Sequence, residues 1–468
     1  MNMAVDGFGE PGIRVVSRRL VKASDPSIQP HVVPLSNLDL YVGNVQVAIL
    51  CLYPKLPAGR DFAGVVATFE SLLPALLNEF YPFAGRIGTN PSSGLPELLC
   101  HNQGAELVVG EVGVALGSLD YGLADKSLKK LMLPYAEDVT LSVQLLSFAC
   151  GSFSVLWATN HLVGDGHDNI RFLRMWSQLA RTGKIVAADG DGDGKLCHDR
   201  SVFRPRNPPS YRASLAADLT TFDPRRLVNV LTAHDSFVDR LYYIEAADIA
   251  SLREMASTEQ RRSSRVQAVS AYLWKVLAGV VAASRVPEER CRMGWWVSAR
   301  RRLTSPELAS AMRNYFGNVT TYAYGDASVE EIQRKSLAEV AAMAREPVAS
   351  VNYEEYIQDL VDFVEVHKGQ GLMETPVVGL GSPILSQSVF DSFPLDTDFG
   401  FGQAALAMPI SDFANLCSAY LSISAKPAGD GSWLVSAYIW PRLAAALEAD
   451  EQHIFKPLTA EYLGLTAS

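Results

Sequence analysis

The sequence lacks a surplus of basic residues, a long apolar run and an apolar leader. Its 468 residues include 41 Lys and Arg against 51 Asp and Glu, for a net charge of -10. Because proteins that bind nucleic acid usually carry a basic surplus, we expect no nucleic-acid partner. No run of 18 apolar residues is present, and Asp6 and Glu10 interrupt any secretory leader. These absences predict a cytoplasmic protein without a membrane partner.

Cysteine is also scarce, and its few copies are scattered along the chain. No two cysteines form a CxxC pair, so the spacing matches neither a zinc ribbon nor a disulfide framework. We therefore expect reduced thiols. The six residues are Cys51, Cys100, Cys150, Cys197, Cys291 and Cys417.

The composition is that of an ordinary globular protein. Hydrophobic residues make up 48% of the chain and charged residues 20%, which excludes disordered and collagen-like proteins. The length suggests two or three domains, or one large one. Residues 183–236 show little apolar periodicity and hold FRPRNPPSYR at 203–212, which is typical of a linker. We predict an N-terminal domain over 1–200, a crossover linker over 201–235 and a C-terminal domain over 236–468.

Helical and strand patterns alternate irregularly, which predicts two mixed α/β halves rather than one parallel sheet. Pro74 is expected to kink or restart the helix that holds it, and Asp168 is a candidate N-cap. Strands are expected at 45–54, 141–150, 153–160, 239–244, 291–299, 418–425 and 433–440. Helices are expected at 64–80, 169–181, 247–256, 265–283, 329–344 and 352–366, with a last one from Pro441.

The segment NHLVGDGHD at 160–168 is the first candidate site. His161 ends a predicted strand beside a glycine turn, where it can project into a cleft and serve as a general base. Asp165 can either orient this histidine or pair with an arginine that holds the turn, and the flanking glycines favour the second role. An HxxxD pattern recurs by chance, so taken alone it indicates a structural histidine at a strand end.

A metal site is the alternative interpretation of this segment. His161, Asp165 and His167 are possible ligands, but no further His or Cys cluster completes a set. The run DGDGDG at 189–194 begins like a calcium loop, yet its twelfth position is Arg200 rather than a bidentate Glu. We therefore expect no bound metal.

A second glycine-rich segment, DFGFG, covers 398–402. Asp398, Gly400 and Gly402 predict a tight turn with aromatic packing. It is not the kinase DFG, because no glycine-rich loop, VAIK lysine or HRD accompanies it. Taken alone, this turn is structural.

Five motifs in order nevertheless carry a resemblance. HxxxDG at 161–166 and DFGFG at 398–402 stand together with LSNLDL at 35–40, FYPFAGRI at 80–87 and NYFGN at 314–318. This set resembles the plant BAHD acyl-CoA-dependent acyltransferases and spans nearly the whole chain. It favours a catalytic role for the histidine of HxxxD over a structural one.

The resemblance implies a fold and a reaction. It implies a monomer of two similar-sized mixed α/β domains, chloramphenicol acetyltransferase-like, with a channel at their interface and His161 in the channel. It implies transfer of an acyl group from acyl-CoA, the co-substrate, to a hydroxyl or amine, with His161 as general base, no covalent acyl-enzyme and no bound cofactor.

The resemblance also implies roles for other residues. The aspartate of HxxxD, here Asp165, pairs in the family with an arginine before YFGN, and SARRR at 298–302 offers Arg300. Gly166 and the DFGFG residues Asp398, Gly400 and Gly402 would support the site. CoA phosphates need cations, for which Arg261, Arg262 and Arg265 are candidates, although a solvated charge run is an equal alternative.

Departures from the family pattern bear on the substrates. Asp391 and Ser392 precede Phe393-Pro394, where members that use shikimate place a basic residue. An acid there would repel shikimate or quinate, and Val47 and Ile49 replace the hydroxyls of such members. Asp391 and Asp396 could attract a cationic amine such as a polyamine, and a neutral or apolar alcohol is the other option.

Two further departures concern the donor and the fold. YFGNV replaces the YFGNC of malonyl-transferring members, which favours an aromatic or hydroxycinnamoyl donor. Phe401 replaces the usual Trp of DFGWG, which keeps aromatic packing and removes an N–H donor; we include it among candidate substrate contacts.

Two functions of other classes compete with this one. Some proteins of this fold act as non-catalytic partners that bind acyl-CoA or another enzyme, and these tend to have damaged motifs. A metal hydrolase around His161 and His167 is the third option. The intact HxxxD favours the acyltransferase.

Overall fold

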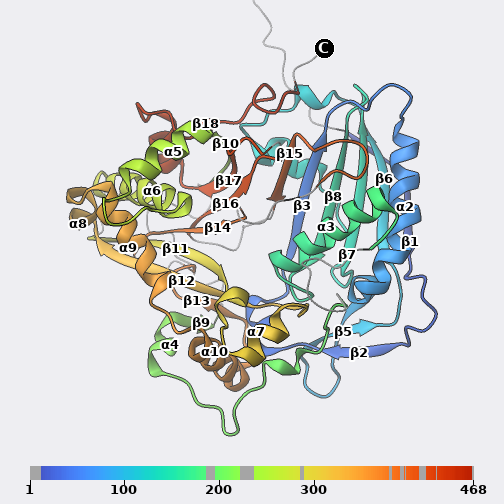
Figure 1. The fold of residues 1–468 in the computed structure, drawn as a ribbon, viewed down its shortest axis with the longest axis horizontal. Coiled ribbons are helices and arrows are strands. Elements are labelled where there is room, and N and C mark those ends of the chain that lie inside the picture. Colours follow the sequence, from blue (N-terminus) through green and yellow to red (C-terminus); the bar gives the residue numbers. More distant parts are fainter. Residues whose placement is uncertain are drawn as a thin grey trace, which may run out of the picture.

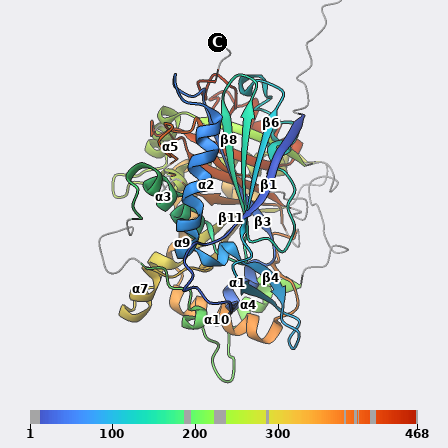
Figure 2. The ribbon, with the colours of Figure 1, turned by 90° about the vertical axis from the view of Figure 1, so that its right-hand side faces the viewer.

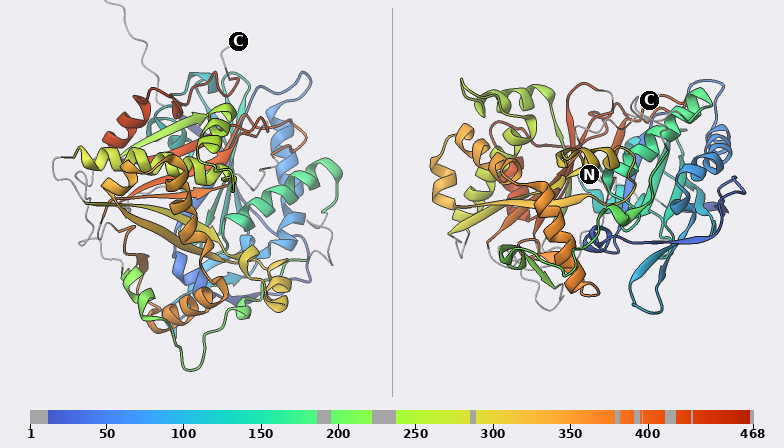
Figure 3. Two further views of the ribbon diagram at one scale, coloured as in Figure 1. Left: turned by 60° about the vertical axis from the view of Figure 1, so that its left-hand side comes forward. Right: turned by 60° about the horizontal axis from the view of Figure 1, so that its bottom comes forward.

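The computed structural model describes residues 12–185, 195–221, 237–284, 289–378, 382–390, 395, 397–410, 418–427 and 429–465. Two large mixed sheets lie next to each other, with helices on their outer sides (Figure 1). In the right panel of Figure 3 the blue-green first half and the yellow-red second half stand on opposite sides of the molecule. The fold is therefore mixed α/β in two halves, as predicted.

The first sheet holds most strands of the first half. Its order is β1 (Ile13–Val21), β6 (Ala105–Val112), β7 (Leu141–Phe148), β8 (Phe153–Asn160), β3 (Gln46–Tyr53) and β15 (Leu406–Ile410). Two helices, α2 (Phe62–Glu79) and α3 (Gly166–Thr182), pack on this sheet (Figure 2), where the Phe69 and Trp176 rings lie 4.9 Å apart. Pro74 lies inside α2 without ending it, so the predicted restart does not occur.

The second sheet belongs wholly to the second half. Its order is β12 (Thr320–Ser328), β11 (Arg290–Ser298), β14 (Ile384–Val389), β16 (Ala419–Ala425), β17 (Trp433–Ile439), β10 (Val238–Ile244) and β18 (Lys456–Pro457). Helices of this half include α5 (Ala246–Met255), α6 (Arg265–Ala282), α8 (Val329–Arg334), α9 (Leu337–Ala349) and α11 (Pro441–Glu448). The single helix predicted at 329–344 is two helices, because Ser336 and Glu339 form a capping box that starts α9.

Shorter elements lie where the two sheets approach each other at the bottom of Figure 1. They are α1 (Asn37–Val42), α4 (Ala213–Asp218), α7 (Pro306–Met312), α10 (Tyr353–His367), β9 (Leu219–Thr221) and β13 (Leu372–Glu374). A three-stranded sheet of β2 (His31–Pro34), β5 (Pro96–Cys100) and β4 (Arg86–Thr89) adjoins them. These elements close the interface from below.

The chain crosses between the halves more than once. β15 comes from the second half but pairs with β3 of the first sheet, with Pro409 opposite Ile49. The predicted linker 201–235 contains α4 and β9, and β9 pairs with β13. The domain boundaries therefore stay a prediction, and β15 is an exception to them. In the described part of the chain, no helix has the length and apolar character needed to cross a membrane.

Candidate active site

A cavity of about 470 Å³ lies between the two halves. Its walls come from α1, β3, β8 and α3 on one side and from β11, β13, β14 and β16 on the other. His161, directly after β8, lines it, and so do Val47 and Ile49 of β3, two predicted contact residues. Most of the lining is apolar, which suits an organic substrate.

Hydrogen bonds determine the tautomer of His161. Its Nδ1 lies 3.0 Å from Oδ1 of Asn318. The amide nitrogen of Asn318 donates to Asp39 Oδ1 and to the His161 carbonyl, each at 2.8 Å, and both partners are acceptors. This assigns the amide orientation, so Nδ1 carries the proton and donates it to Asn318. Nε2 is left with a lone pair that can accept a proton.

Asp39 anchors this arrangement from α1. It is fully buried, and its second carboxylate oxygen lies 2.5 Å from the Arg200 guanidinium. The same carboxylate caps α1 together with Ser36. A chain of contacts from Arg200 through Asp39 and Asn318 therefore holds His161. Sequence reasoning marked LSNLDL and NYFGN as motifs but assigned no role to Asp39, Asn318 or Arg200.

Asp165 caps α3. Its Oδ1 accepts hydrogen bonds from the backbone N–H groups of His167 and Asp168, at 3.0 and 3.3 Å. The helix therefore begins at Gly166, three residues earlier than predicted, and Asp168 is not the N-cap. The capping carboxylate satisfies amides that the first turn leaves without partners.

Arg300 is the partner that the resemblance implied for Asp165. Its Nη2 lies 3.2 and 3.3 Å from the two oxygens of Asp165 and 3.0 Å from Oδ2 of Asp168. The guanidinium also donates to the carbonyls of Tyr315 and Gly317. Val319 N–H donates to Asp165 at 3.0 Å. Asp165 thus joins the two halves.

Burial and charge shift the acidity of this cluster. Burial opposes ionisation of Asp165, but the Arg300 guanidinium and the Val319 amide hold its pKa below the usual range. Burial, with the Asp165 charge, raises the pKa of Asp168 to about 7. Burial and the Arg300 charge lower the pKa of His167 to about 4. Asp165 is therefore the ionised partner of Arg300, and His167 is neutral.

Close packing explains the glycines of the turn. A Cβ on Gly166 would lie 2.7 Å from the Phe390 ring, which approaches from the second half. A Cβ on Gly164 would lie 2.7 Å from Oδ2 of Asp168. Any larger residue would push these groups away from the site.

The DFGFG turn packs on the first half. Oδ1 of Asp398 accepts from the N–H groups of Gly400 and Gly402 at 2.8 and 3.1 Å, and both glycines have φ near +90°. The Phe401 ring lies 6.1 Å from that of Phe153 and under the Arg60 guanidinium, outside the described walls of the cavity. Phe401 therefore does not line this cavity, and its contact with substrate stays a prediction.

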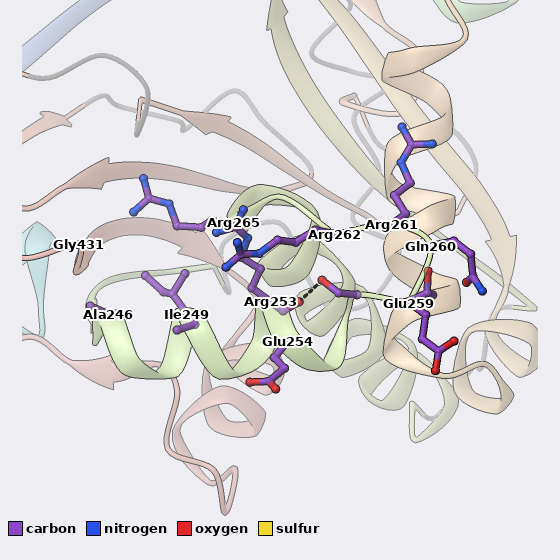
Figure 4. A pocket seen from close by; sticks show the side chains of 13 residues that line it. Ala246, Ile249, Arg253, Glu254, Glu259, Gln260, Arg261, Arg262, Arg265 and Gly431 are labelled. Atoms are coloured by element: carbon purple, nitrogen blue, oxygen red, sulfur yellow. Dashed lines mark hydrogen bonds between the residues drawn. The ribbon is translucent and has the colours of Figure 1, made fainter.

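The three arginines proposed for CoA line a separate hollow of about 680 Å³, between α5, α6 and the turn at Gly431. Arg253 of α5, which sequence reasoning missed, joins Arg261, Arg262 and Arg265 there. In Figure 4 the Arg261 side chain points away from the other three. Arg261 and Arg262 are exposed, so this hollow is a charged, solvent-facing site.

Some predicted residues lie outside the described residues. These are Asp391, Ser392, Phe393, Pro394, Asp396 and the run at 189–194. Across the described residues, no three His, Cys, Asp or Glu side chains gather in a way that could hold a metal ion.

The fold has two similar-sized mixed α/β domains and a histidine in the cavity between them. This arrangement defines the chloramphenicol acetyltransferase-like class of acyltransferase folds. The family model described as Transferase family matches residues 12–453, and the chain belongs to this family, the BAHD acyl-CoA-dependent acyltransferases. The family resemblance seen in the motifs is thereby confirmed.

Individual relatives agree with this assignment. Putrescine hydroxycinnamoyltransferase of Oryza sativa subsp. japonica is 28% identical over 95% of this chain and 99% of its own. The crystal structure of vinorine synthase matches with a TM-score of 0.69 at 20% identity, over 98% of this chain and 99% of its own. That of F. graminearum TRI101 with coenzyme A and T-2 mycotoxin gives 0.72 at 14% identity, over 91% and 99%. The predicted fold class and enzyme class are confirmed: the protein is an acyltransferase that uses acyl-CoA as co-substrate and a small-molecule acceptor.

Proposed function

We propose that the protein transfers an aromatic acyl group of the hydroxycinnamoyl kind from CoA to a hydroxyl or amine of a plant specialised metabolite. His161 is the general base, and no covalent acyl-enzyme forms. The name of the rice relative supports this donor, as does Val319, which replaces the cysteine of malonyl-transferring members. The apolar cavity suits an aromatic group.

The lone pair on Nε2 of His161 is the observation that carries this proposal. The nucleophile of the acceptor gives its proton to Nε2 and attacks the thioester carbonyl carbon. The tetrahedral oxyanion then collapses, the carbon–sulfur bond breaks, and the imidazolium returns the proton to the CoA thiolate. General base action contributes roughly 10²–10⁴-fold to the rate, and positioning of two substrates in one cavity contributes about 7 kcal/mol or more in good cases.

Asp165 and Arg300 act as positioning residues in this mechanism. Their ion pair joins the turn after His161 to the segment that carries Asn318. Gly166, Asp398, Gly400 and Gly402 support the same turn and the neighbouring core. Because these groups have structural partners, they need not touch the substrates.

The acyl-CoA is proposed to place its phosphates at the basic hollow. Arg253, Arg262 and Arg265 present their cationic groups there, whereas Arg261 points elsewhere (Figure 4). Guanidinium groups bind phosphate in the bidentate manner that such recognition requires.

A thiol-release assay tests the function. Wild-type protein and His161→Ala are crossed with coumaroyl-, caffeoyl-, feruloyl-, benzoyl-, malonyl- and acetyl-CoA and with alcohols, a phenolic amine, a polyamine and shikimate. We expect release that needs both acceptor and His161. The exposed His101→Ala is the matched control and should retain full activity. Release that His161→Ala leaves unchanged would contradict the mechanism, and a biological role that survives in this variant would favour a non-catalytic partner.

The oligomeric state and location remain part of the proposal. We expect a monomer in the cytoplasm, because each chain contains both halves of the cavity. Light scattering during size-exclusion chromatography checks the first expectation, and fractionation of the native tissue checks the second.

A further inference from the structure

A patch of hydroxyl groups lies in the wall that the second sheet gives to the His161 cavity. It comes from β14 and β16, which are neighbouring strands of that sheet (Figure 1). In their register Ser386 lies opposite Tyr420. Two residues further along, Ser388 lies opposite Ser422, and all four side chains line the cavity. Because alternate residues of a strand point to one face, the four form one hydroxyl patch, which sequence reasoning did not mark.

The first sheet gives the same cavity an apolar row. Pro409 of β15, Ile49 of β3 and Trp157 of β8 lie side by side in the register of that sheet, and all three line the cavity. Val47 lines it as well, two residues before Ile49 on β3. These two residues of β3 stand where shikimate-using members carry hydroxyls. In this chain the hydroxyls lie instead on the strands of the second sheet.

Ser388 has a hydroxyl proton to offer to a ligand. The Tyr420 hydroxyl donates to Oγ of Ser388 at 2.7 Å. Burial raises the pKa of Tyr420, so the phenol keeps its proton and acts as this donor. Ser386 differs, because its Oγ and the Tyr322 hydroxyl lie 2.7 Å apart and satisfy each other. Among the described residues no group accepts the proton of Ser388, which is therefore available.

Ser388 lies at some distance from the reacting group. Phe390, two residues further along the chain, reaches the turn after His161, because a Cβ on Gly166 would lie 2.7 Å from its ring. Two residues of a strand span about 7 Å. A substrate atom at Ser388 therefore belongs to the end of the acyl group or of the acceptor that lies away from the bond being formed.

The chemistry of the hydroxyl patch selects an uncharged oxygen. A hydroxyl that offers its proton needs an acceptor atom, which an ammonium group does not have. A carboxylate would need a cation, and no Lys or Arg lines the described walls of the cavity. Once a substrate closes this wall off from solvent, Ser388 stays unpaired unless the substrate brings an acceptor, and the unpaired group weakens binding.

We propose that Ser388, oriented by Tyr420, is a specificity-determining residue that donates a hydrogen bond to an uncharged hydroxyl oxygen at the far end of a substrate. That hydroxyl belongs either to the ring of the acyl group or to the acceptor, and the recognition is the same in both cases. The apolar row around Ile49 packs against the carbon frame of the same substrate. The inference rests on the proposed function and adds to it a residue and the substituent that this residue recognises.

Two matched substrate pairs test the inference on the wild-type protein and distinguish the two sources of the hydroxyl. 4-Coumaroyl-CoA and cinnamoyl-CoA differ only by the ring hydroxyl of the donor, and tyramine and phenethylamine only by that of the acceptor. Each pair is measured with one fixed co-substrate. We expect kcat/KM for the hydroxylated member of one pair to be about fivefold to a hundredfold higher, the range for a lost hydrogen bond that leaves its partner unpaired. Ratios near one in both pairs would overturn the inference.

The variant Ser388→Ala removes the donor and little volume. The ratio that exceeds one should fall to near one, through a loss for the hydroxylated substrate alone. Tyr420→Phe leaves the Ser388 hydroxyl free to turn, so it should lower the same ratio by a smaller factor, and it serves as the test if Ser388→Ala does not fold. The exposed Ser92→Ala is the matched control and should keep the wild-type ratio. A ratio equal to that of the wild type in either variant of the patch would overturn the inference.

The failure of this inference can be told apart from that of the proposed function. His161-dependent transfer with ratios near one in both pairs overturns the inference alone. If no pair gives His161-dependent transfer, the proposed function fails. The Kd values of the same four compounds, measured by calorimetry with wild-type protein and Ser388→Ala, then decide whether the hydroxyl contact exists.

Discussion

The cavity at His161 and the basic hollow at Arg262 are built in different ways. In the cavity His161 contacts Asn318, and Asp165 contacts Arg300. In the hollow Arg261 and Arg262 are exposed, and Arg253 of α5 and Arg265 of α6 are half-buried. A substitution in the cavity should therefore break the geometry, whereas one in the hollow should change affinity and its dependence on salt.

The largest effect is expected when the Asp165–Arg300 pair is broken. Arg300→Met or Asp165→Asn leaves one buried charge without its partner, which should cost about 3–5 kcal/mol of unfolding free energy and displace His161. Urea denaturation and kcat measure the two effects. The neighbouring exposed Arg301→Met serves as control. If Asp165→Asn keeps wild-type stability and the position of His161 but loses activity, Asp165 has a direct chemical role.

The next largest effect is a pH dependence of the free energy of unfolding, which His167 in the cavity wall produces. His167 has a folded-state pKa of about 4, below the ordinary value of 6.5, so the unfolded chain binds the proton first as pH falls. Stability should fall between pH 6.5 and 4 by about 3 kcal/mol from this group. His167→Gln should flatten that part of the profile of denaturation midpoint against pH. His198, whose pKa burial lowers to about 3, leaves a residual slope of the same sign, and Asp168, whose pKa is raised to about 7, leaves one of the opposite sign. A profile identical to wild type would show that His167 is protonated in the folded protein.

A smaller effect is expected in the basic hollow. Arg262→Ala should raise KM for acyl-CoA about two- to fivefold, as loss of an exposed ionic contact does, and the difference should shrink in high salt. Arg261→Ala should change KM less, because its side chain points away from the other arginines (Figure 4). Steady-state kinetics at two salt concentrations checks both. A larger effect at Arg261 than at Arg262 would place CoA on another surface.

The smallest effect is expected at Phe401. Phe401→Trp restores the usual residue of the family motif, but the ring packs on Phe153 and Arg60 outside the cavity. The free energy of unfolding should change by about 0.5 kcal/mol, which shifts the melting temperature only slightly. KM for both substrates should stay the same. A large change in either KM would mean that the turn reaches a substrate.

Particular residues show how far sequence reasoning extends. His161, Asp165 and Arg300 could be identified because each lies in a short, continuous sequence motif. The glycines of the two turns could be identified because a tight turn requires them locally. Asp39 and Asn318 were missed as residues that hold His161. Each makes its contacts with segments more than 100 positions away, and periodicity reports only on neighbours along the chain.

Secondary structure shows the same division. Most strands and helices lie within a few residues of their predicted ranges, because apolar periodicity is a local signal. The start of α3 and the break between α8 and α9 were not predicted correctly. Both depend on which side chain caps the first backbone amides of the helix, and several Ser and Asp residues nearby could do so.

The sequence by itself determined the family, the mixed α/β class and the histidine at the end of a strand, since these depend on motifs and local patterns. Only the tertiary structure decided the tautomer of His161, the crossing of β15 into the first sheet and the pairing of Asp39 with Arg200. These features need two distant segments to meet, and burial gives their charges and hydrogen bonds a strength that no stretch of sequence carries alone.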